Sequence, residues 1–167
     1  DYQDWGITLH LNTPITAIDI AAKTVTSAQG ECYSYSRLVL ATGSFPFVPP
    51  IQGNDRSQCL VYRTIEDLEA IQLAAKNSQV GVVVGGGLLG LEAANAMMQL
   101  GVKTHVVEFA PQLMPVQLND KAGELLCSKI EQLGVSVHTS KATTAIIDGE
   151  SALHRMTFKD ESYLETD

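Results

Sequence analysis

Three glycines spaced G-x-G-x-x-G form the part of this sequence best suited to bind a charged ligand. They directly follow an apolar run of β-branched residues at 82–84. In this setting the first glycine permits a tight turn, the second lets a pyrophosphate approach the backbone, and the third lets a helix pack closely on the sheet. The N–H groups that begin the helix then face the phosphate charge. The predicted dinucleotide site therefore comprises Gly85, Gly86, Gly87, Leu88, Leu89 and Gly90.

An acidic residue, Glu108, ends the next apolar run about 20 residues past the start of the motif. A carboxylate at this position can accept both hydroxyls of an adenosine ribose, and we interpret Glu108 as the ribose ligand. Two structural readings compete with this one. The glycines could form a turn in an α/β protein that binds no ligand, and Glu108 could be a solvated carboxylate at a strand end.

The surrounding pattern supplies the elements that such a site needs. A strand at 80–84 leads through the glycines into a helix, Leu88 to Leu100, which Gly101 ends before a second strand, Val102 to Phe109. Thr64 and Asp67 fit a capping box for an earlier helix with an apolar stripe. A further helix is predicted from Asp120 to Leu133, with Asn119 as its N-cap and Gly134 just past its end. Strands are predicted at 135–139, 143–147, 153–158 and around Tyr163.

The sequence thus predicts an α/β fold, with a Rossmann-like parallel sheet, flanking helices and an antiparallel β-meander. Before it, residues 1–42 resemble β-structure, with strands expected at 7–12, 15–20 and 24–27 and a buried strand at 37–41. Prolines and a glycine make residues 43–62 a connector. Both ends of the chain read as cut, and we interpret it as part of a larger protein.

Composition argues against several classes of function. The net charge of −8 disfavours a nucleic-acid or anionic-membrane surface. The longest uncharged apolar stretch, Val80 to Leu91, is too short to span a bilayer, and no signal peptide is visible, so a cytoplasmic location is expected. The cysteines lack C-x-x-C spacing and are expected to be reduced thiols, and the histidines are read as strand residues that bind no metal. These residues are Cys32, Cys59 and Cys127, and His10, His105, His138 and His154.

With these motifs in place, the chain resembles FAD-dependent pyridine-nucleotide oxidoreductases. The resemblance rests on Leu40-Ala-Thr-Gly-Ser44 followed by several prolines, on the glycine motif, and on Tyr62-Arg-Thr-Ile-Glu-Asp67. Two segments are more specific and are similar to the large subunits of assimilatory NAD(P)H nitrite reductases. They are Leu88-Leu-Gly-Leu-Glu-Ala-Ala-Asn95 and His105-Val-Val-Glu-Phe-Ala-Pro111.

This resemblance implies three regions: 1–62 as part of an FAD-binding domain, 63–79 as a linker helix, and 80–167 as a C-terminally truncated NAD(H)-binding domain. It also implies that Ala41, Thr42 and Gly43 approach a flavin through backbone atoms, and that Glu92, in the first helical turn, lies near the nicotinamide. Each has a structural alternative. Thr42 and Gly43 could be only a strand-to-loop turn, and Glu92 could simply complement a helix N-terminus.

In such an enzyme NADH reduces FAD, and electrons pass to an iron–sulfur cluster and sirohaem, where nitrite becomes ammonia. The resemblance implies these cofactors in the parent protein, with a small nitrite reductase subunit as a further partner. The cysteines here lack cluster spacing, so no metal ligand and no catalytic side chain is assigned, and the chain alone is expected to be inactive. The alternatives are a related ferredoxin or rubredoxin reductase or an NADH oxidase, and a non-catalytic NAD-binding regulatory domain.

Overall fold

The computed structural model describes residues 2–167, and its contacts divide the chain into two units, 1–44 and 45–167. The first unit holds a short 3-10 helix, η1 (Gln3–Trp5), and an antiparallel sheet of three strands. These strands are β1 (Ile15–Asp19), β2 (Thr24–Ser27) and β3 (Cys32–Ser34). The turn predicted at 28–31 lies between β2 and β3.

Two strands predicted in the first unit are wrong. Residues 7–12 form no strand, although their apolar and polar residues alternate, and Leu9 and Leu11 are exposed. The apolar run 37–41 is also irregular, and Val39 is 84% exposed. A segment with an alternating or apolar pattern forms a strand only where a neighbouring strand supplies the hydrogen-bond partners. In this unit the strand that pairs with β2 on its second side is β3, which was not predicted.

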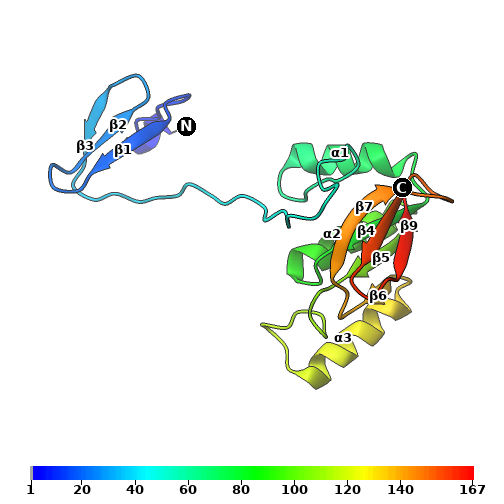
Figure 1. Ribbon diagram of the computed structural model, residues 1–167. Coiled ribbons are helices and arrows are strands. Elements are labelled where there is room, and N and C mark those ends of the chain that lie inside the picture. Colours follow the sequence, from blue (N-terminus) through cyan, green and yellow to red (C-terminus); the bar gives the residue numbers. More distant parts are fainter. Residues whose placement is uncertain (1) are drawn as a thin grey trace. The chain divides into compact units, whose positions relative to one another are not determined.

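The second unit contains the remaining elements, which follow the predicted order (Figure 1). They are α1 (Ile65–Ala75), β4 (Val80–Val84), α2 (Leu88–Gln99), β5 (Lys103–Val107), α3 (Asp120–Gln132), β6 (Ser136–His138), β7 (Thr143–Asp148), β8 (His154–Phe158) and β9 (Tyr163–Thr166). The strands β4, β5 and β6 form a parallel sheet in that order, and β7, β8 and β9 form an antiparallel meander. The predicted α/β fold is therefore confirmed.

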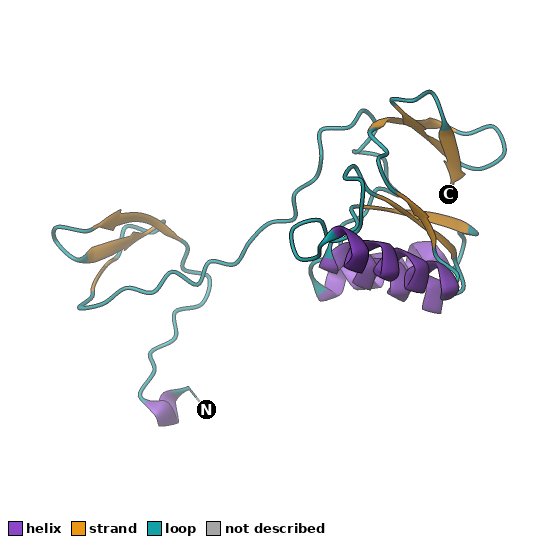
Figure 2. Cartoon of the chain, turned by 90° about the horizontal axis from the view of Figure 1, so that it is seen from below, coloured by secondary structure: helices purple, strands orange, loops and turns teal. Residues whose placement is uncertain are grey.

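The second unit is built in layers, with helices on one face of the parallel sheet and the meander on the other (Figure 2). Neighbouring residues of β5 point to opposite faces, as the pleat requires. Val106 packs with Ala94 and Leu113 on the helical side, whereas Val107 packs with Met156 and Phe158 of β8. Both faces of β5 are therefore buried, which explains its continuous apolar sequence.

Local signals fixed the ends of the helices. The capping box of α1 is confirmed, because the Asp67 amide donates to Thr64 Oγ1 at 3.2 Å and the Thr64 amide donates to Asp67 Oδ2 at 2.8 Å. Asn119 caps α3 through its side chain. Gly101 and Gly134, just past the ends of α2 and α3, have φ of +84° and +98°, where glycine is favoured.

Replacing the cap of α1 is expected to destabilise the second unit modestly. Thr64→Ala removes the acceptor for the Asp67 amide, and such changes cost about 1 kcal/mol in the free energy of unfolding. Thr64→Ser keeps the hydroxyl and is the matched control. Denaturant unfolding followed by far-UV circular dichroism measures both variants. Equal stability of the alanine and serine variants would show that this hydrogen bond contributes nothing.

Candidate dinucleotide-binding site

The glycine loop joins the carboxyl end of β4 to the start of α2. Gly85 has φ of +113°, a backbone conformation that side chains disfavour, and its amide donates to Val107 O at 2.8 Å. This bond continues the β4–β5 ladder by one residue before the chain turns. The sharp turn off the strand predicted for Gly85 is therefore present.

Gly90 lies against the start of the same loop. A Cβ built on Gly90 meets Gly85 O at 1.9 Å and the Gly85 carbonyl carbon at 3.0 Å, both rigid backbone atoms. The first turn of α2 approaches the end of β4 so closely that only a residue without a side chain fits. This close packing is the physical task predicted for the third glycine of the motif.

The start of α2 differs from the starts of the other helices among the described residues. The helices α1 and α3 begin with side-chain caps, whereas Gly87, the N-cap of α2, supplies none. The first helical hydrogen bond runs from Leu91 N to Gly87 O, so the preceding amides of Leu88, Leu89 and Gly90 have no partner within the helix. These amides form a local positive end on which a phosphate can bind.

Open space lies beside Gly87. A Cβ built on this residue has no atom within 4 Å, and its φ of −82° is ordinary for any residue. Neither packing nor backbone strain of the chain itself therefore requires glycine there. The open space leaves room for a ligand to approach the backbone, and that approach, expected at the second glycine of the motif, stays a prediction.

Glu108 directly follows β5, and its carboxylate reaches back to the loop. Oε2 accepts from the Gly86 amide at 2.6 Å, and Oε1 accepts from the Ala110 amide at 2.7 Å. Each carboxylate oxygen has a further lone-pair site, so both can still accept ribose hydroxyls. The sequence predicted that Glu108 lies beside the glycine loop, but it gave no signal for these two bonds.

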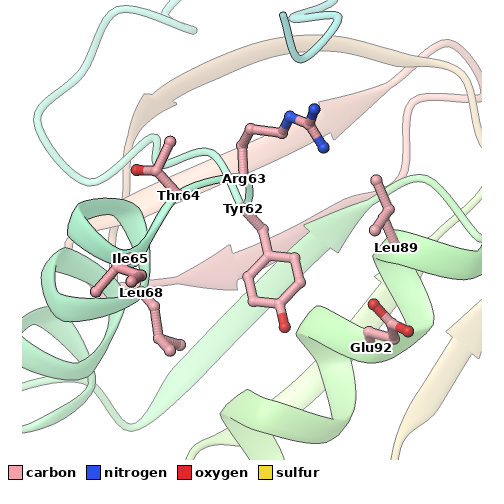
Figure 3. A pocket seen from close by; sticks show the side chains of 7 residues that line it. All are labelled: Tyr62, Arg63, Thr64, Ile65, Leu68, Leu89 and Glu92. Atoms are coloured by element: carbon pink, nitrogen blue, oxygen red, sulfur yellow. The ribbon is translucent and has the colours of Figure 1, made fainter. Parts of the chain in front are cut away.

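A cavity of about 330 Å³ lies between the start of α1 and the first residues of α2 (Figure 3). Glu92 lines this cavity. It was predicted to lie in the first turn of α2, but it is the fifth residue of the helix and lies beyond that turn. Tyr62 points into the cavity from the segment before α1, and Arg63 lies beside it. Neither residue was predicted as a site residue. Both belong to the segment 62–67 that carries the family resemblance, and this was the signal that could have indicated them.

The other predicted site residues belong to the first unit. Ala41, Thr42 and Gly43 lie in an exposed segment without regular structure, and Gly43 has φ of +72°. Their predicted contact with a flavin stays a prediction.

The cysteines are free thiols, and three of the histidines lie in strands as predicted. His10 does not, because the strand expected around it is absent. The described part of the chain has no group of three or more His, Cys, Asp and Glu side chains arranged to hold a metal ion. Within residues 2–167, none of the helices has the length and apolar character needed to cross a bilayer.

Comparison with known proteins agrees with this geometry. The chain is 53% identical over 162 residues to the large subunit of NAD(P)H nitrite reductase from Klebsiella oxytoca, covering 97% of this chain and 17% of that protein. It is 50% identical over 167 residues to the NADH nitrite reductase large subunit of Escherichia coli K12, covering 99% of this chain and 20% of that protein. The chain thus spans about a fifth of these relatives.

A ferredoxin reductase from Rhodopseudomonas palustris shares the fold, with a TM-score of 0.88 and 25% identity over 99% of this chain and 41% of that chain. The model of the pyridine nucleotide-disulphide oxidoreductases matches residues 2–167. Since this match covers nearly the whole sequence, the chain belongs to the pyridine nucleotide-disulphide oxidoreductase family.

Proposed function

We propose that this chain is the NADH-binding electron-input part of a flavin-dependent nitrite reductase. The observation that carries the proposal is the uncapped start of α2 together with the open space at Gly87, which suits the backbone approach of a pyrophosphate. Nitrite reductase large subunits are the relatives at 50–53% identity, and this supports the choice of parent enzyme.

In this proposal the chain binds and orients the dinucleotide. The amides of Leu88, Leu89 and Gly90 hold the pyrophosphate, and Glu108 holds the adenosine ribose. The nicotinamide half then extends into the cavity of Figure 3, which Leu89 and Glu92 of α2 line. When bound, NADH supplies the hydride and a flavin receives it, and the protein contributes orientation and the exclusion of water.

The other redox groups of the parent enzyme are not assigned to these residues. The described residues include no group of three or more His, Cys, Asp and Glu side chains arranged to hold a metal ion, and the iron–sulfur cluster and sirohaem are proposed for other parts of the parent protein. Flavin contact at residues 41–43, a cytoplasmic location and a small partner subunit are proposed from the resemblance. Alone, the chain is expected to bind NADH without turning it over.

A ferredoxin reductase is the second candidate, because the Rhodopseudomonas palustris enzyme shares the fold. Its lower identity of 25%, against 50% or more for the nitrite reductases, makes it the less favoured parent activity. An absorbance spectrum of the parent protein separates the candidates, since sirohaem bands are expected only for a nitrite reductase.

The chain is expected to prefer NADH over NADPH by at least about tenfold. The 2′-phosphate of NADPH carries about −1.5 to −2 charges, and at about 5 Å from Glu108 each unit costs roughly 3 kcal/mol before salt screening. If salt screening reduces this repulsion to about 1.4 kcal/mol, the remaining energy still corresponds to a tenfold difference in affinity. Lys141, whose backbone amide donates to Glu108 O, does not offset this charge, because its ammonium is held by Asp160 and Ser162.

The test is the ratio of the NADH and NADPH dissociation constants in wild type, Glu108→Ala and Glu108→Gln. Because the Glu108 carboxylate also holds the Gly86 amide, its loss can disturb the loop and weaken both cofactors. The ratio removes that shared effect and reports only on the ribose end. Glu92→Gln is the matched control and is expected to keep the wild-type ratio. If the Glu108 variants also keep it, Glu108 is not the ribose ligand.

A further inference from the structure

Two histidines form a hydrogen-bonded pair between β5 and β6 that the proposed function does not use. His105 Nδ1 and His138 Nε2 lie 2.9 Å apart, and the rings are stacked at 17° with centroids 5.2 Å apart. In the parallel register His138 pairs with Val107, so both imidazoles project from the sheet face that the meander covers. His105 is only 9% exposed.

The proton count of this pair is limited by its geometry. When both rings are neutral, one facing nitrogen donates its proton and the other accepts it. A first added proton can bind the outward nitrogen of the donor ring, and the hydrogen bond is kept. A second added proton must bind the accepting nitrogen, which places two N–H groups face to face across 2.9 Å. The paired arrangement therefore excludes the second proton.

The surroundings also disfavour positive charge on the pair. Burial, followed by the charges of His138 and Lys103, lowers the pKa of His105. Burial and then Lys141 lower the pKa of His138, against a smaller opposite effect of Glu131 on α3. Asp160, which follows β8, is paired with the Lys141 ammonium. Because the folded pKa values are lowered, the pair contributes stability above the ordinary histidine pKa of about 6.5 and loses it as the pH falls.

The pair is connected directly to the dinucleotide edge. The Glu108 amide donates to His138 O at 2.8 Å, and this bond extends the β5–β6 ladder to the predicted ribose ligand. On the other side of β5, Val107 O accepts from the Gly85 amide of the glycine loop. Any separation of β5 from β6 at the two rings therefore moves the backbone that carries Glu108.

We propose that the His105–His138 pair is a pH-sensitive latch that closes the β5–β6 ladder beneath the dinucleotide site and opens when a second proton binds. An open latch frees the Glu108 amide from His138 and displaces the carboxylate from the glycine loop. Acidification thus loosens the adenosine end of the site. The effect on cofactor binding rests on the proposed function, whereas the opening of the ladder does not.

Hydrogen exchange of the Glu108 amide in the 167-residue chain measures the opening directly. If the open form binds one proton that the closed form excludes, the protection factor falls about tenfold between about pH 7.5 and about pH 5.5, after correction for the intrinsic exchange rate. Amides in the β7–β8 ladder are expected to change much less. An unchanged protection factor at Glu108 in wild type overturns the proposal without any variant.

Variants connect the effect to the two rings. His138→Gln and His105→Gln remove the excluded proton, so Glu108 protection is expected to become independent of pH within about twofold. His10→Gln, in the first unit, is the control and is expected to keep the wild-type pH dependence. Persistence of that dependence in both glutamine variants overturns the latch.

Binding of ADP-ribose, which is stable in acid and lacks only the nicotinamide ring of the cofactor, separates this inference from the proposed function. Weaker ADP-ribose binding at low pH in wild type, lost in the glutamine variants, supports both. No binding at any pH refutes the proposed function alone, and the exchange experiment still decides on the latch. If the affinity for ADP-ribose does not change with pH while the protection factor of the Glu108 amide falls, the latch opens without moving the ribose ligand. This result overturns that part of the proposal.

Discussion

Gly87→Val is expected to weaken NADH binding roughly 100-fold while leaving the fold intact. The valine side chain occupies the space beside the start of α2 where we propose that the pyrophosphate approaches the backbone. Two charge-assisted hydrogen bonds lost there cost roughly 3 kcal/mol, which corresponds to about 100-fold in affinity. Stability is expected to change by less than about 1 kcal/mol, because φ at Gly87 suits any residue and no atom lies within 4 Å of the added Cβ.

Titration calorimetry with NADH and denaturant unfolding measure these two quantities on the same protein. Gly87→Ala provides a graded comparison, and its loss of affinity is expected to be smaller because its side chain is shorter. If Gly87→Val binds NADH as wild type does, the pyrophosphate does not lie at the start of α2 and the proposed site is wrong. If the variant unfolds instead, the space beside Gly87 is needed by the chain itself.

Gly90→Val is expected to show the opposite pattern, with a loss of about 3 kcal/mol in the free energy of unfolding. The added Cβ meets the Gly85 carbonyl, and neither backbone segment can yield without separating α2 from the end of β4. Binding is expected to fail as a consequence of this shift. Gly87→Val, three residues earlier at the N-cap of α2, is the matched control because it adds the same side chain without a clash. Wild-type stability of Gly90→Val would contradict the close packing of helix and strand.

The second unit could be predicted from sequence because each element carries its own local signal. The capping box at Thr64 and Asp67, the cap at Asn119 and the glycines past α2 and α3 act within a few residues of the ends they define. The glycine loop is equally local, since its turn and its close approach depend on missing side chains. Such signals need no knowledge of what lies beside the element.

The errors lie where structure depends on a partner distant in sequence. Residues 7–12 and 37–41 have the pattern of strands, but pairing decides whether a strand forms, and no single-strand pattern reports it. The Glu108–Gly86 bond and the His105–His138 pair also join residues more than 20 positions apart. The carboxylate could be placed at the loop by its motif, whereas the histidine pair follows only from the register of β5 with β6.

The bonds of Glu108 to Gly86 and Ala110 also bear on how fast a cofactor is bound. They fix the glycine loop before any ligand arrives, so little chain entropy remains to be lost on binding. A site of this kind accepts its ligand without a slow rearrangement, and the association rate is then limited by encounter and orientation. Stopped-flow traces of ADP-ribose binding are accordingly expected to show one phase, whose rate rises in proportion to ligand concentration.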